Sequence, residues 1–123
     1  HLGQVYTRDP EKKLVLLTWL REHHANAASA DLEAALLPLL EDFSDDVRIT
    51  ATRALVAVSP GEKARDALIQ LLLRDRDNAR VRGEVLEAMA SIGADVKGHR
   101  PTVETLLVEP FFLDREGRVK KRG

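Results

Sequence analysis

A short turn motif recurs three times along this chain, and its spacing constrains the fold more than any other feature. Each copy joins an apolar helix end to a few acidic residues and then to a Val followed by a basic residue. The Val residues of the three copies lie 34 and 38 residues apart. Periods of this length are typical of stacked helical units, none of which buries its apolar face alone. The three copies span Leu39–Arg48, Leu72–Arg82 and Phe112–Lys120.

Apolar residues between the turns follow helical spacing. In a helix expected from about residue 30 to 42, and in the helix that Ser44 caps, the apolar residues share the offsets 0, 4, 7, 8 and 11. Further helices are expected from Asp9 to about His24, from a capping box at 59–62, from Asn78, from Pro101 to about Leu113, and from Gly117. No β-sheet is expected. The two stripes are Leu32, Leu36, Leu39, Leu40 and Phe43, then Val47, Ala51, Ala54, Leu55 and Val58.

Two prolines occupy the same place in the repeat. Pro38 lies four residues before Asp42, and Pro110 lies four residues before Asp114. A proline late in a helix disturbs it, because it lacks an amide hydrogen and its ring crowds the preceding turn. We therefore expect the same kink in both copies, which favours one repeated unit over a chance periodicity.

These residues resemble HEAT repeats, whose unit is two antiparallel helices with a late Pro, an Asp in the turn and Val-Arg in the second helix. Pro38 with Asp42 and Val47-Arg48 fits this pattern well, and so does Asp75 with Val81-Arg82. The resemblance implies an all-α, right-handed superhelix of about three helical hairpins, with residues 1–123 forming a single segment of a longer repeat protein. It also implies that basic residues at one repeat position, Arg48, Arg82 and Lys120, join a ladder of ion pairs. We interpret Arg48 and Arg82 as structural rather than ligand-binding.

Composition and motifs argue against an enzyme. The chain has no cysteine, which excludes disulfides and thiolate metal sites, and its net charge of −1 gives no general attraction to nucleic acid or membranes. His23 and His24 are adjacent rather than three or four residues apart, and His99 stands alone, so no metal site is expected. No catalytic residues and no cofactor are expected. The prediction is a cytoplasmic protein.

The resemblance places a partner-binding groove on the concave face that the second helices of the repeats form. Positions opposite the buried stripe form a mixed apolar and charged strip that suits a helix or peptide of another protein. Some of its apolar members could equally pack against neighbouring repeats. The alternative function is a nucleic-acid-binding or modifying HEAT-like domain, which the neutral charge and few aromatics disfavour. The strip comprises Leu14, Leu17, Thr18, Arg21, Ile49, Thr52, Arg53, Val56, Leu86, Glu87 and Ala90.

The C-terminal end carries two further expectations. The basic residues Arg118, Lys120, Lys121 and Arg122 are interpreted as the start of another helix, with a patch for an anionic partner as the alternative. Without that helix, the apolar residues of the preceding one would lack cover. We therefore expect either self-association through this open end or marginal stability of the last hairpin.

Overall fold

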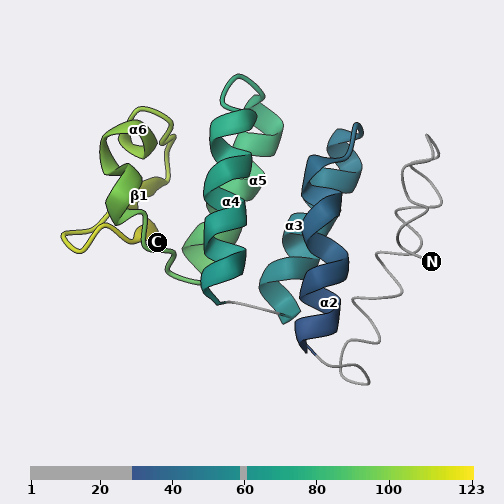
Figure 1. Cartoon of the computed structure of the whole chain (residues 1–123). Helices are drawn as coiled ribbons and strands as arrows, with labels where there is room; N and C mark the ends of the chain where they lie inside the picture. The colour runs from purple at the N-terminus through teal and green to yellow at the C-terminus, as the bar shows by residue number, and fades with distance from the viewer. Residues whose placement is uncertain (1–28, 59–60) are drawn as a thin grey trace. The chain divides into compact units, whose positions relative to one another are not determined.

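The computed structural model describes residues 29–58 and 61–123, and the chain divides into two compact units at Ala64 and Arg65. The expected helix from Asp9 to about His24 lies outside the described residues. The described residues are mostly helical, as the repeat pattern predicts (Figure 1). Among them, no helix combines the length and apolarity needed to cross a membrane. The right-handed sense of the superhelix stays a prediction.

The first unit contains helix α2 (Ser29–Leu36), the 3-10 helix η3 (Leu37–Glu41) and helix α3 (Asp45–Val58). The change from α to 3-10 geometry occurs at Leu37 and Pro38, where proline removes one amide from the α-helical hydrogen-bond pattern. The expected disturbance at Pro38 is therefore confirmed as a tightening of the last helical turn.

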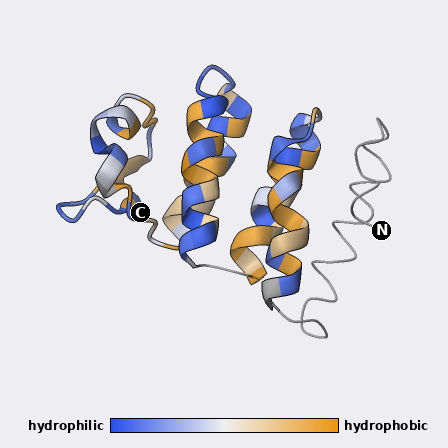
Figure 2. Cartoon of the chain, in the orientation of Figure 1, coloured by the Kyte–Doolittle hydropathy of each residue, from blue (hydrophilic) through white to orange (hydrophobic). Residues whose placement is uncertain are grey.

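The two apolar stripes of this unit are buried, with one exception. Leu36 and Leu39 are 1% exposed, and Val47 and Leu55 are fully buried. Phe43 was expected on the same stripe, but its side chain is 80% exposed. The reason is that η3 ends at Glu41 and the next residue is extended, so Phe43 leaves the helical phase. Figure 2 shows the hydropathy pattern behind this burial, with polar residues gathered at the turns and apolar residues recurring along the helices.

The second unit contains most of helix α4 (Glu62–Arg74) and helix α5 (Ala79–Ser91), joined by a short turn. Their buried residues follow the predicted stripes, with Leu68, Leu72 and Val81 fully buried. Helix α5 ends at Ser91, and Gly93 two residues later has a left-handed φ of 59°. The amide of Ala94 there donates to the carbonyl of Met89 at 2.9 Å, which satisfies a free carbonyl of the last turn. Gly93 therefore acts as the left-handed stop after this helix.

The last part of the chain differs from the expectation of two more helices. A 3-10 turn η4 (Lys97–His99) and a short helix α6 (Arg100–Glu104) are followed by strands β1 (Phe111–Leu113) and β2 (Val119–Lys121). The strands pair antiparallel, with Phe112 opposite Lys120. The expectations of a helix that reaches Leu113 and of another helix from Gly117 are therefore wrong. The expectation that the chain contains no β-sheet is wrong as well. Pro110 follows a cis peptide bond in the segment before β1 rather than kinking a helix.

The hairpin turn explains why strands form at this point. The Asp114 carboxylate accepts hydrogen bonds from the amides of Glu116 at 3.0 Å and Arg118 at 2.9 Å. Gly117 has a φ of 82°, which glycine adopts without the steric cost of a side chain. A tight turn followed by a left-handed glycine is a common three-residue connection between antiparallel strands. Asp114–Gly117 thus encodes a strand reversal.

The hairpin covers the end of the second unit. In the hairpin, Val119 is fully buried and Phe111 is 9% exposed. Val96 and Val103, which precede the hairpin in the chain, are also fully buried. Strand β2 also bonds the segment after α5, because the Val119 amide donates to the carbonyl of Ala94 at 3.0 Å. The open apolar end expected at the last helix is therefore wrong: Leu106 is 7% exposed, and Leu107 and Phe112 are half-buried. The basis for expecting self-association through this end is removed.

Candidate partner-binding surface

The turns before α3 and α5 repeat the same side-chain contacts 34 residues apart. Ser44 Oγ accepts the Val47 amide at 3.4 Å, and Asn78 Oδ1 accepts the Val81 amide at 3.1 Å. These contacts satisfy amides that the first turn of a helix leaves without a partner. The equivalence extends the sequence periodicity to individual atoms.

The repeated arginines bond equivalent carbonyls. Arg48 Nη1 donates to the carbonyl of Asp42 at 2.8 Å, and Arg82 Nη1 donates to the carbonyl of Arg76 at 2.7 Å. Arg48 also pairs with Asp45 in the same turn. Both guanidinium groups therefore tie the start of one helix to the turn before it, which supports a structural role. The third basic residue of the series, Lys120, lies exposed on β2 instead.

The family model for HEAT repeats matches residues 32–110, which is more than half of the chain. The chain belongs to the HEAT-repeat family. The match includes both helical pairs and their duplicated turns, and it ends before β1. No curated protein and no solved structure matches the chain. The family thus accounts for the helical repeats, and the hairpin follows them.

Helix α3 carries four members of the predicted strip, and the structure separates them. Ile49 is 4% exposed and Thr52 is fully buried, with its hydroxyl donating to the carbonyl of Arg48 at 2.8 Å. Arg53 is exposed and Val56 is half-buried. Only the second pair is available to a partner on this HEAT repeat. Ile49 and Thr52 serve packing instead, which is the alternative that the sequence left open for some members of the strip.

The strip members on α5 are covered more fully. Leu86 is fully buried, and Ala90 is half-buried. Glu87 is exposed, but its carboxylate pairs with Lys121 Nζ of strand β2 at 2.9 Å. The C-terminal hairpin thus engages the charged member of this part of the strip. The remaining members, Leu14, Leu17, Thr18 and Arg21, lie outside the described residues.

A small cavity in the second unit was not predicted from the sequence. Its volume is about 230 Å³, below the range of sites for drug-sized ligands. The Arg65 guanidinium at its rim already donates two hydrogen bonds to one carboxylate oxygen of Asp66. No group of three His, Cys, Asp or Glu residues within the described ranges could hold a metal. The cavity lining is Arg65, Asp66, Ile69, Asp95, Val96, Gly98 and His99.

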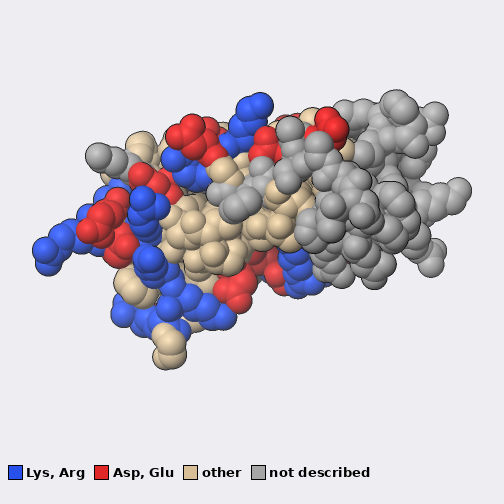
Figure 3. Space-filling model, turned by 90° about the horizontal axis from the view of Figure 1, so that it is seen from below, with Lys and Arg blue, Asp and Glu red and all other residues tan. Residues whose placement is uncertain are grey.

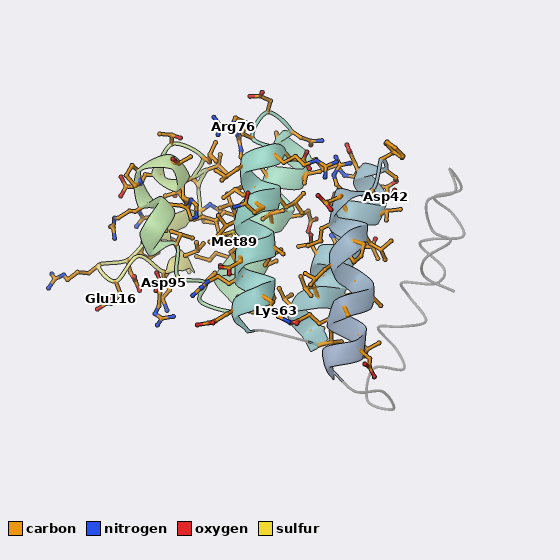
Figure 4. All side chains as sticks on the ribbon, in the orientation of Figure 1. Asp42, Lys63, Arg76, Met89, Asp95 and Glu116 are labelled. Atoms are coloured by element: carbon orange, nitrogen blue, oxygen red, sulfur yellow. The ribbon has the colours of Figure 1, made fainter. Side chains whose placement is uncertain are left out.

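The C-terminal hairpin is the structural feature that sequence reasoning missed. Its signal was present, since Asp114–Gly117 is a turn sequence between short runs that contain Phe, Leu and Val. Seen from below in Figure 3, Lys and Arg side chains gather at the hairpin end of the second unit. Figure 4 shows Glu116 at the tip of the hairpin and Asp95, whose backbone pairs with Arg118 just before β2.

Proposed function

We propose that this chain is a non-catalytic module that binds or scaffolds another protein through the surface of α3 around Arg53 and Val56. HEAT repeats generally mediate protein–protein interaction, and this chain belongs to that family. The observation that carries the proposal is the contrast between two equivalent helices. Glu87 of α5 pairs with the hairpin, whereas on α3 the Arg53 side chain is exposed and Val56 is half-buried. The cytoplasmic location stays a prediction.

An exposed arginine next to a partly apolar surface suits a protein partner. Arginine pairs with carboxylates through several donors and contributes apolar contact through its stem. Val56 adds apolar area that a partner would remove from water. The alternative of a nucleic-acid-binding domain gains no support from the net charge of −1.

Site-specific crosslinking tests this proposal. A photoreactive amino acid replaces Arg53 in one sample and Glu104, an exposed residue of α6, in a matched control. After irradiation in a lysate of the source cells, we expect a discrete protein adduct from position 53 alone. Nucleic-acid adducts at position 53, or the same adducts from both positions, would contradict the proposal.

A further inference from the structure

We propose that the outer face of the C-terminal hairpin binds an extended acidic peptide of a partner protein. The outer face is defined by the side chains of Phe112, Arg118, Lys120 and Arg122. It is a second surface, separate from the α3 surface proposed above, and its test does not depend on that proposal. The basic residues of this face, which were interpreted from the sequence as the start of a helix, lie on and beside strand β2 instead.

Strand alternation sets which side chains share this face. Val119 is fully buried and Lys121 reaches Glu87 of α5, so these two residues point toward the helix. Successive side chains of a strand point to opposite faces, which places Lys120 and Arg122 on the other side. Phe112 lies directly opposite Lys120 in the strand pair and therefore shares its face.

The charges of this face are held in place but remain accessible. The Arg122 guanidinium lies over the Phe112 ring, 4.5 Å from its centroid. Its pair with Glu109, at 3.5 Å, joins side chains that are 58% and 81% exposed, so water weakens it. Arg118 uses one guanidinium nitrogen to bond the carbonyl of Gly93 at 3.0 Å. The Lys120 side chain is exposed and makes no hydrogen bond or ion pair with any residue in the described ranges.

The spacing of these cations fits an extended peptide. Residues 118, 120 and 122 occupy alternate positions of a strand-like segment, so their Cα atoms lie about 6.8 Å apart along it. A peptide with an acidic residue at every second position has the same spacing in an extended conformation. Phe112 supplies an apolar contact between the charged groups, which a peptide side chain could cover.

The surrounding acidic residues favour a short peptide over a nucleic acid. Asp114 and Glu116 lie at the turn end of the hairpin, and Glu109 lies beside Arg122 at the other end. A phosphate backbone that continued past the three cations would approach these carboxylates and be repelled. A peptide can carry neutral or basic residues at those points. Charge complementarity therefore selects a short acidic segment.

Nuclear magnetic resonance titration of the whole chain tests the proposal. The probe is the synthetic peptide acetyl-Glu-Ser-Glu-Ser-Glu-amide, with the Gln-Ser-Gln-Ser-Gln peptide as its uncharged control. We expect saturable shifts in the amides of residues 111–122 with the acidic peptide only. Added salt should weaken the binding, because exposed charge pairs are screened.

Two variants of equal charge change show whether the hairpin is the site. Lys120→Glu should weaken acidic-peptide binding at least fivefold, and Lys63→Glu, at an exposed position of α4, should leave it unchanged. The amide shifts of Val119 and Phe111 report whether the hairpin stays folded in each variant. Equal losses in both variants would overturn the proposal, as would the absence of saturable binding. Tighter binding of a thymidine octanucleotide than of the peptide would identify a nucleic-acid surface instead.

Discussion

The same turn motif gives a helix at two places in this chain and a strand at the third. Before α3 and α5, Ser44 and Asn78 cap the helix three residues ahead of Val47 and Val81. At the third copy the residue three before Val119 is Glu116, and the next is a left-handed glycine. A helix start needs a capping side chain, whereas a left-handed glycine after a tight turn joins strands. One position in the motif therefore changes the local structure.

The residues after the Val make the same distinction. After Val47 the chain continues with a buried stripe that ends at Val58, so α3 has a face to pack. After Val119 the next residues are Lys, Lys and Arg, which give a helix no apolar face. Most helical stability in proteins comes from packing such a face. The turn motif therefore predicts a HEAT hairpin only when a capping residue precedes the Val and a buried apolar stripe follows it.

The largest expected effect tests whether the two helical copies are equivalent in their cores. Leu55 and Met89 occupy the same repeat position and are both fully buried. Replacing either with Ala removes buried apolar volume and should lower the free energy of unfolding by about 2–5 kcal/mol. Arg53→Ala, on the exposed side of α3, should cost under about 0.5 kcal/mol. Denaturant unfolding measures all three, and similar losses for Leu55 and Arg53 would show that the helix phase is wrong.

The two repeated arginines should contribute different amounts to the free energy of unfolding, although their hydrogen-bond geometry matches. Arg48 is 6% exposed, whereas Arg82 is half-buried. Arg48→Met should lower the unfolding free energy by about 1.5–3 kcal/mol, as expected for hydrogen bonds that involve a charged group. For Arg82→Met we expect about 0.5–1.5 kcal/mol, because water competes for the bond. A larger loss of unfolding free energy for Arg82→Met than for Arg48→Met would show that burial does not determine which arginine stabilises its turn more.

The helical repeats could be predicted from the sequence because their signals are local and repeated. Spacing and caps located the turns, and the stripe identified Val47, Leu55 and Val81 as core residues. Whether Ile49 and Leu86 are buried stayed open at the level of the sequence, because it depends on what packs against the second side of each helix. The engagement of Glu87 by Lys121 depends on a contact 34 residues away, which no local pattern encodes.

Val119, the Val of the third motif copy, is fully buried within the hairpin packing. Its replacement by Ala removes two buried methyl groups, which lowers the stability of the hairpin by about 1.6 kcal/mol. Amide hydrogen exchange in β1 and β2 should accelerate, while exchange in α3 stays unchanged. Lys120→Ala is the matched control and should alter protection by under about 0.5 kcal/mol. Loss of protection throughout the chain would mean that the hairpin does not open separately.

Two glycines should respond in opposite directions to the same substitution. Gly117 has a left-handed φ of 82°, so Gly117→Ala should destabilise the hairpin by about 1–2 kcal/mol. Gly83 lies within α5, and a methyl group built there meets no atom within 4 Å. Gly83→Ala should therefore raise stability by about 0.5–1 kcal/mol, through better helix propensity. Thermal unfolding of the two variants gives the signs, and a gain at Gly117 would overturn the assigned turn.

The smallest expected effect is a pH dependence confined to the hairpin. The amide of Arg118, which donates to the Asp114 carboxylate, lowers the pKa of this group below its ordinary value of 3.8. The Glu116 amide and the charges of Lys120 and Arg118 act in the same direction, while desolvation opposes them. Because the pKa of Asp114 is lower in the folded hairpin, its carboxylate contributes its full stabilisation of the hairpin at pH values above its unfolded pKa. That contribution is lost as pH falls through the folded value.

Nuclear magnetic resonance between pH 5 and pH 2 measures this effect. The amides of Glu116 and Arg118 should shift with a midpoint below 3.8, and hairpin protection should decrease over the same range. Asp114→Asn is the matched control, because an amide oxygen can accept both hydrogen bonds but does not titrate. The acid-induced change should disappear in this variant. If it persists, another carboxylate causes it, and the third copy of the motif does not depend on Asp114 as a charged turn residue.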